Sequence, residues 1–201
     1  MQPEFHLTPE EEALVENSGW ILAKQRIIGK VYGMFGLLSA YYSETLTHYS
    51  EYIPDEVRAV SPKIYKGEMY RQMPYVMLDH PRFFSAEHTF AIRCFFWWGN
   101  HFSIHLLLSG KYRERYIDAL SNSINMGLLD DWFIGVADEP WDHHFDEENY
   151  QPVHFIRNNK QQQIKSGNYL KLAKNHSFDQ WNDTYAFYIA SYKRLLESMC
   201  L

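Results

Sequence analysis

Three groups of residues in this sequence carry side chains suited to binding or catalysis. The first is the segment Trp141 to Glu148, WDHHFDEE, which combines imidazoles with carboxylates. Zn²⁺ and Mn²⁺ accept these ligands, so the segment is a candidate metal site. Adjacent histidines in a loop rarely reach one ion, and the alternative is an exposed acidic turn. The candidate metal ligands are Asp142, His143, His144 and Asp146.

The second group is Asp79-His80-Pro81-Arg82, at the end of an expected strand. Strand ends commonly present functional side chains on a rigid scaffold. Asp79 would orient a nearby imidazole, and Arg82 would bind a carboxylate or a phosphate. The alternative is a turn before proline with a surface ion pair. Asp79, His80 and Arg82 are therefore candidate ligand-binding residues.

The third group lies in an apolar segment and consists of Cys94, His101 and His105. If Cys94 faces His105 across a hairpin, a thiolate–imidazolium pair becomes possible. The alternative is a packed, inert thiol beside histidines that bond to carbonyl or tyrosine groups. Arg93 is a charge among apolar residues and must be paired, either with Asp79 on a neighbouring strand or with an anionic ligand.

A β-hairpin over about 89–109 must position this third group. The dipeptide Gly-Asn separates two apolar arms rich in Phe, Trp, Ile and Leu, which predicts a two-residue type II′ turn. That turn fixes a register in which Trp98 faces His101 and Cys94 faces His105. Both faces are mostly apolar, so the hairpin is expected at the centre of a sheet.

Helices are predicted on both sides of the hairpin. Thr8 and Glu11 form a capping box that starts a first helix ending near Asn17. Apolar residues at helical spacing predict a second helix from Trp20 to about Thr47. Further helices are expected over Lys111 to Asn125, over about Asn158 to Lys174, and after a capping pair at Ser177 and Gln180.

Shorter strands complete the expected sheet. Candidates are Lys63 to Tyr65, Tyr75 to Leu78 and Trp132 to Val136. Pro81 should end its strand or confine it to an edge, because proline cannot donate to a ladder. The expected fold is a single α+β domain over residues 1–201. Its antiparallel sheet is built on the central hairpin, with N-terminal helices and two C-terminal helices packed around it.

Composition narrows the class of protein. The net charge is −6, which argues against nucleic acid as a partner, because nucleic-acid binding needs a basic footprint. The long apolar stretches carry charges, so a membrane association is not expected. The first residues are acidic and the chain has two cysteines, which points to a soluble, cytoplasmic protein without a disulfide framework.

The sequence favours a non-enzymatic binding module. Aromatic residues make up 17% of the chain, which indicates a large core or an aromatic-lined pocket, and an acidic run after residue 137 offers an interaction surface. The expected partner is a small molecule or another protein. The alternative is a divalent-metal-dependent hydrolase that uses the His/Asp/Glu cluster. No phosphate-binding loop, dinucleotide fingerprint, nucleophile elbow or CxxC pair occurs, and the sequence specifies no cofactor.

Overall fold

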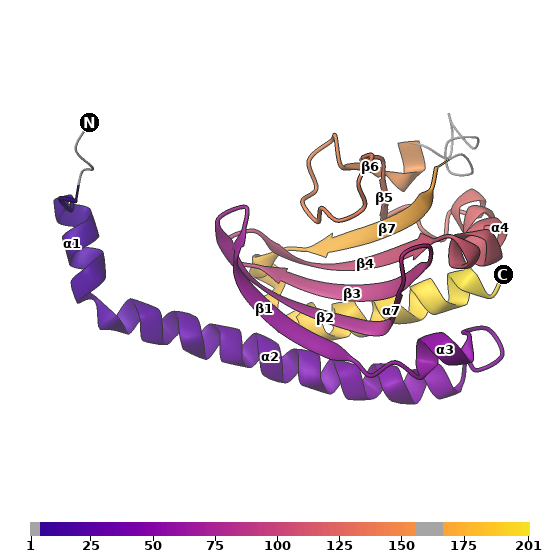
Figure 1. The fold of residues 1–201 in the computed structure, drawn as a ribbon, viewed down its shortest axis with the longest axis horizontal. Helices are drawn as coiled ribbons and strands as arrows, with labels where there is room; N and C mark the ends of the chain where they lie inside the picture. The colour runs from indigo at the N-terminus through magenta and orange to yellow at the C-terminus, as the bar shows by residue number, and fades with distance from the viewer. Residues whose placement is uncertain (1–4, 156–166) are drawn as a thin grey trace.

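The computed structural model describes residues 5–155 and 167–201, which fold around one antiparallel sheet (Figure 1). The strands within these residues are β1 (Lys63–Tyr70), β2 (Met73–Phe84), β3 (Thr89–Trp97), β4 (His101–Ser109), β5 (Phe133–Gly135), β6 (Tyr150–Pro152) and β7 (Tyr169–His176). Their order across the sheet is β1-β2-β3-β4-β7-β5-β6. The α+β class and the central position of the β3–β4 hairpin are confirmed.

Helices cover one face of this sheet, and the chain between β5 and β6 crosses the other (Figure 1). The two long helices of the covered face, α2 and α7, contact each other as well as the strands. The described helices are α1 (Pro9–Glu16), α2 (Ser18–Thr47), α3 (Asp55–Arg58), α4 (Lys111–Asn125), the 3₁₀ helix η1 (Phe178–Asp183) and α7 (Thr184–Met199).

The main core lies between the sheet and these helices. Alternate residues of β3 and β4 point into it, including Phe96 and Phe102, which are almost completely buried. Phe35 of α2 and Tyr188 of α7 belong to the same core, and their rings pack edge to face with centroids 5.6 Å apart. Burying each large side chain contributes roughly 2–3 kcal/mol, so this face of the sheet dominates stability.

The predicted register of the β3–β4 hairpin is wrong by one residue. Trp97 pairs with His101, so the turn contains three residues, Trp98, Gly99 and Asn100. The N–H of Asn100 donates to the carbonyl of Trp97 at 3.0 Å, and Gly99, with a φ of +74°, holds the third position of this turn, where a type II turn requires positive φ. Compared with the predicted register, this shift of one residue places each β4 side chain on the other face of the hairpin relative to the side chains of β3. Arg93 therefore lies opposite His105, and Cys94 lies opposite Ile104.

Strand β2 is longer than expected and is not at an edge. It continues through Pro81 to Phe84 and pairs with β1 on one side and β3 on the other. The pairing with β3 shifts register between Asp79 and Arg82, so the missing proline donor falls in an irregularity of the ladder. The expectation that Pro81 ends the strand or keeps it at an edge is therefore wrong.

The C-terminal region differs from the prediction as well. Of the helix expected over Asn158 to Lys174, residues 158–166 lie outside the described residues, and Tyr169 to Lys174 belong to β7. Strand β7 pairs along its whole length with β4, and this non-local pairing outweighs local helix propensity. The expected capping pair at Ser177 is also wrong, because η1 begins there without a side-chain cap and α7 begins only at Thr184.

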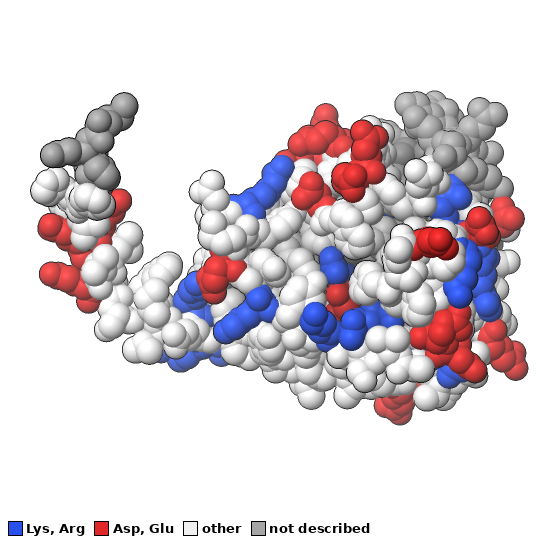
Figure 2. Space-filling view, in the orientation of Figure 1, with Lys and Arg blue, Asp and Glu red and all other residues white. Residues whose placement is uncertain are grey.

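Helix α1 and the first part of α2 form an arm that stands clear of the sheet (Figures 1 and 2). The predicted capping box of Thr8 and Glu11 is present, and Asn17 separates α1 from α2 as expected. No residue of α1 is buried, and the first buried residue of α2 is Ile28. Among the described helices, none is both long and apolar enough to span a bilayer.

Candidate functional site

A row of polar side chains crosses the sheet on the face opposite the long helices. Asp79 of β2, Arg93 of β3 and His105 of β4 are directly paired in the strand register. Arg93 donates from Nε to one oxygen of Asp79 at 2.6 Å and from Nη2 to the other at 2.9 Å. The expected pairing of Arg93 with Asp79 is confirmed. The bidentate geometry balances a charge that would be costly to bury alone.

The loop between β5 and β6, residues 136–149, closes over this row. Its residue His143 is buried and accepts a hydrogen bond at Nε2 from Arg93 Nη1 at 2.8 Å. Burial lowers the pKa of His143 well below its usual value, which leaves the imidazole neutral and able to accept. The hydroxyl of Tyr70 accepts hydrogen bonds from the backbone N–H groups of His143 and His144, at 2.7 and 3.1 Å.

Lys171 of β7 adds a second cation under the same loop. Only 1% of the residue is exposed, and its ammonium group donates to the backbone carbonyl of Asp142. It also lies over the ring of Tyr150, 4.7 Å from the centroid. Burial, together with the charge of Arg93, lowers the pKa of Lys171 to about 7. Sequence reasoning missed this residue because it assigned the segment to a helix.

His105 is held inside the sheet face by two hydroxyl groups. Its Nδ1 lies 2.8 Å from the hydroxyl of Tyr150, and its Nε2 lies 2.8 Å from Oγ of Ser103. Burial lowers the pKa of His105 well below the ordinary value. With both ring nitrogens within hydrogen-bond distance of a hydroxyl group, His105 links β4 to β6. Its ring also packs against that of His143 in the 136–149 loop, with centroids 4.7 Å apart.

Cys94 belongs to the opposite face and does not meet His105. Its Sγ lies 3.3 Å from the hydroxyl of Tyr42, inside the main core. Burial raises the pKa of the thiol, so the thiolate that a nucleophile requires is disfavoured. The predicted pairing of Cys94 with His105 is wrong because of the longer hairpin turn.

His101 lies at the hairpin end of the polar face. Its ring packs edge to face against Trp97 and Phe145, with centroids 5.6 and 5.1 Å away. Burial lowers its pKa to about 4, and its buried Nε2 has no hydrogen-bond partner within the described part of the chain. A hydrogen bond to the backbone of His143 acts on this pKa in the opposite direction, so His101 contacts the 136–149 loop beside the polar row.

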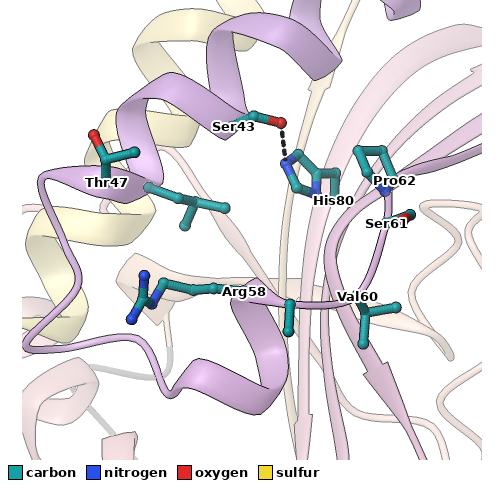
Figure 3. Close-up of a pocket in the computed structure, with 9 residues that line it drawn as sticks. Ser43, Thr47, Arg58, Val60, Ser61, Pro62 and His80 are labelled. Atoms are coloured by element: carbon teal, nitrogen blue, oxygen red, sulfur yellow. Dashed lines mark hydrogen bonds between the residues drawn. The ribbon is translucent and has the colours of Figure 1, made fainter.

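A hollow of about 320 Å³ lies on the helix side of β2, where α2 ends (Figure 3). His80 forms part of the wall of this hollow, and its side chain lies on the face of β2 opposite that of Asp79. Arg82 does not line the hollow but contacts one of its residues, because Arg82 Nε donates to the backbone carbonyl of Ser61 at 2.9 Å. The residues that line the hollow are Ser43, Leu46, Thr47, Arg58, Ala59, Val60, Ser61, Pro62 and His80.

The hydrogen bonds of Ser43 determine which ring nitrogen of His80 carries the proton. The Ser43 hydroxyl donates to the carbonyl of Ser39 at 2.9 Å, so its oxygen accepts from His80 Nε2 at 2.9 Å (Figure 3). Burial and the nearby charge of Arg82 lower the pKa of His80 to about 4. The neutral ring then keeps a lone pair on Nδ1, which is buried and lacks a partner among the described residues.

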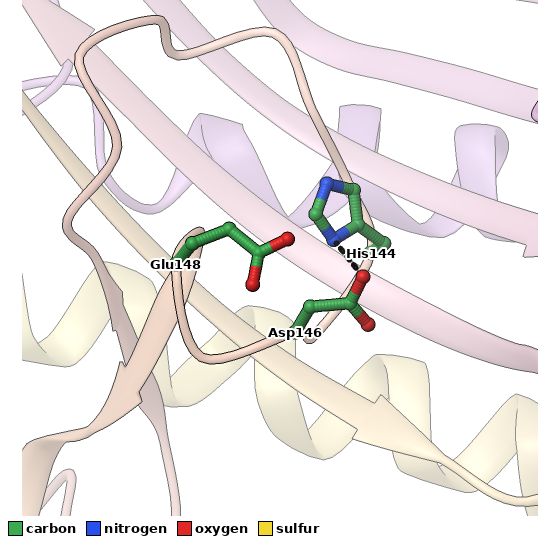
Figure 4. A group of neighbouring side chains, drawn as sticks. All are labelled: His144, Asp146 and Glu148. Carbon is green, nitrogen blue, oxygen red and sulfur yellow. Dashed lines mark ion pairs between the residues drawn. The ribbon is translucent and has the colours of Figure 1, made fainter.

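A third group lies within the 136–149 loop and combines a buried imidazole with two exposed carboxylates (Figure 4). Ligand atoms of His144, Asp146 and Glu148 all lie within 4.8 Å of one another. The Nδ1 of buried His144 is 3.1 Å from an oxygen of Asp146 without making a hydrogen bond. Arg71 donates to Asp146 at 2.8 Å, and this bond lowers the pKa of Asp146.

The structure thus distributes the residues predicted as sites over several places. Asp79, Arg93 and His143 are joined by hydrogen bonds, and the ring of His105 packs against that of His143. His80 lines the hollow, and Cys94 lies in the main core. Of the predicted metal ligands, His144 and Asp146 come together, and Asp142 is more distant, 3.8 Å from His144 Nε2. Sequence reasoning missed Lys171, Ser43 and Arg58, and it included Glu148 in the candidate segment without naming it as a ligand. Comparison of the chain with protein-family models, curated proteins and solved structures found no match.

Proposed function

We propose that this chain is a non-catalytic binding module that holds a small anionic molecule in the hollow beside His80. The hollow measures about 320 Å³, within the range of small-molecule sites. None of the described residues that line it is Phe, Tyr or Trp, so the pocket proposed here is polar and aliphatic in character. Its polar groups are the Ser43, Thr47 and Ser61 hydroxyls, the Arg58 guanidinium and the His80 imidazole.

The observation that carries the proposal is the unpartnered Nδ1 of His80. A buried acceptor without a donor costs about 1–3 kcal/mol, and a ligand O–H or N–H that entered the wall of the hollow far enough to reach Nδ1 would recover that cost. His80 is neutral near pH 7, which suits an acceptor more than a proton shuttle. The proposed function is therefore binding and not catalysis.

The charge of the ligand follows from Arg58. Its Nε donates to the carbonyl of Ile53 at 3.0 Å, and Nη2 bonds to Asp55, whose side chain is exposed. An exposed ion pair is weak, so an anion in the hollow can compete for the guanidinium. A carboxylate or phosphate that also carries a hydroxyl or amino group satisfies both Arg58 and His80.

Isothermal titration calorimetry of the full chain with malate, serine and inorganic phosphate tests this proposal. We expect measurable binding of at least one probe, and roughly tenfold weaker binding in His80→Phe and in Arg58→Gln. Arg194→Gln is the matched control, because Arg194 also forms an exposed ion pair three residues along a helix. Absence of binding to every probe, or unchanged affinity in both hollow variants, would overturn the proposal.

A metal-dependent hydrolase is the second candidate, and it rests on His144, Asp146 and Glu148. One imidazole and two carboxylates form a donor set that Zn²⁺ and Mn²⁺ accept, and a bound ion could activate water. The ion would have to compete with Arg71 for Asp146. Titration with Zn²⁺ and Mn²⁺ should show binding that His144→Ala abolishes and that exposed His154→Ala preserves. Hydrolysis of nitrophenyl esters only with bound metal would support an enzyme.

A further inference from the structure

The N-terminal arm exposes a run of large apolar side chains. We define the arm as residues 5–27, comprising α1 and the start of α2, in which no residue is buried. Val15 is 74% exposed and Trp20 is 47% exposed. Contiguous exposed apolar surface marks interaction sites in folded proteins. The large apolar residues exposed on the arm are Phe5, Leu7, Leu14, Val15, Trp20, Ile21 and Leu22.

The apolar face of α2 continues beyond the sheet. Ile28 and Phe35 are buried against the body, and Ile21 precedes them by seven and fourteen residues, which places it on the same side of the helix. Trp20 precedes Ile28 by eight residues and shares that side. The face that packs on the sheet in the body is therefore uncovered in the arm.

Helix α1 is too short to be stable as an isolated helix. It has eight residues, and isolated helices shorter than about 12–15 residues are marginal in water. Its capping box helps, but helices gain most of their stability from packing an apolar face. A partner that covers Leu14, Val15 and Trp20 would supply the missing packing.

Charge is divided between the two parts of the arm (Figure 2). Helix α1 carries only acids among its charged residues, whereas residues 18–43 of α2 carry only bases. One of these bases, Lys24, also pairs with Glu68 of β1. The acids of α1 are Glu10, Glu11, Glu12 and Glu16, and the bases of α2 are Lys24, Arg26 and Lys30.

We propose that the arm is a dimerisation surface for a second copy of this chain. Two copies related by a two-fold axis would each place acidic α1 against the basic start of the partner's α2, which makes the contact self-complementary. Helix α1 does not fold back on its own α2, because Asn17 alone joins the two helices and α1 turns away (Figure 1). The acids of α1 also disfavour an anionic membrane as the occupant.

Sedimentation equilibrium of the full chain provides the first test. We expect a dimer that dissociates more readily at high salt, because part of the contact is electrostatic. Trp20→Asp should weaken association by roughly tenfold or more, since it places a charge in the apolar contact. Leu37→Asp is the matched control, because Leu37 is also exposed on α2 but lies outside the arm.

Charge reversal supplies a sharper test. One variant carries Glu12→Lys and Glu16→Lys, and the other carries Arg26→Glu and Lys30→Glu. Each should be monomeric alone, because like charges face each other in its homodimer. An equimolar mixture should form a heterodimer, since both contacts then join opposite charges. Circular dichroism checks that each variant remains folded.

The proposal fails if the wild-type chain is monomeric at every concentration, or if the mixture of charge-reversed variants does not associate. It also fails if Trp20→Asp and Leu37→Asp leave the dimer equally strong. Binding of a monomeric wild-type chain to phosphatidylserine vesicles would assign the arm to a membrane surface and would equally overturn it.

Discussion

Arg93 and Asp79 hold each other in a bidentate ion pair across β3 and β2, with their side chains only 13% and 4% exposed. The third nitrogen of the guanidinium bonds to His143 of the overlying loop. One arginine thus joins two strands and a loop, and its role in this structure is architectural. The 136–149 loop covers this network, in which the buried Nδ1 of His143 has no hydrogen-bond partner among the described residues. The proposed ligand site lies on the other face of the sheet, in the hollow beside His80.

Removing Arg93 should destabilise the fold strongly. Arg93→Met leaves the carboxylate of Asp79 buried without its cation, and breaking a buried pair in this way costs about 3–5 kcal/mol. Urea unfolding of the variant measures the loss. Arg194→Met, which breaks the exposed pair with Glu197, should cost less than about 1 kcal/mol. Similar losses in the two variants would contradict the architectural role.

Tyr70→Phe should loosen the 136–149 loop. The substitution leaves the N–H groups of His143 and His144 without their acceptor, which costs about 1–3 kcal/mol. Hydrogen exchange at these two amides should become faster, while exchange in β3 and β4 stays slow. Tyr185→Phe removes an exposed hydroxyl and serves as control. Unchanged exchange at the two amides would show that the loop does not depend on Tyr70.

Lys171 should make stability rise with pH above neutrality. Its folded-state pKa of about 7 lies below the ordinary 10.5, so between these values the unfolded chain holds a proton that the native protein has released. Relative to Lys171→Met, the wild type should therefore gain up to about 1.4 kcal/mol per pH unit above pH 7. Below pH 7 the difference should be constant. Parallel stability profiles of the two proteins from pH 6 to pH 9 would contradict this.

Gly110→Ala should disrupt the connection from β4 into α4. Gly110 has a φ of +54°, and an added Cβ would lie 2.2 Å from His88 Nδ1 and 2.3 Å from the carbonyl oxygen of Glu87. We expect a loss of roughly 2 kcal/mol or more, measured by thermal unfolding. Gly33→Ala in α2 meets no atom within 4 Å and should gain about 0.5–1 kcal/mol. Equal effects of the two substitutions would show that the backbone at position 110 does not require glycine.

Elements with strong local signals could be predicted from the sequence. The capping box at Thr8 and the break at Asn17 were readable from side chains within a few positions of each other. Helix Lys111–Asn125 has the predicted bounds, because its apolar residues recur at helical spacing. The hairpin over 89–109 was readable from two apolar arms around a glycine turn.

The register of that hairpin could not be fixed in the same way. Gly99 fits both a two-residue and a three-residue turn, and the choice between them exchanges the faces of β4. Because of this error, His105 was predicted to pair with Cys94, whereas in the structure it pairs with Arg93. In a hairpin with two buried faces, apolar pattern does not favour one register over the other.

The polar sites depend on contacts between distant segments. Lys171 reaches the sheet face only because β7 pairs with β4, which no local pattern in that segment indicates. The hollow combines Ser43 of α2, Arg58 of α3 and His80 of β2, which are separated in the sequence. Sequence reasoning identified His80 as a candidate from its neighbours but could not find the residues that surround it.

Helix α2 carries Trp20 near one end and Ser43 near the other without interruption. At about 1.5 Å of rise per residue, roughly 35 Å separate them. Because a continuous helix moves as one rigid body, a dimer contact that rotated the arm would also displace Ser43. The hydrogen bonds of Ser43 set the tautomer of His80, so they would change as well. Assembly and ligand affinity would then be thermodynamically linked, and each would strengthen or weaken the other by the same factor.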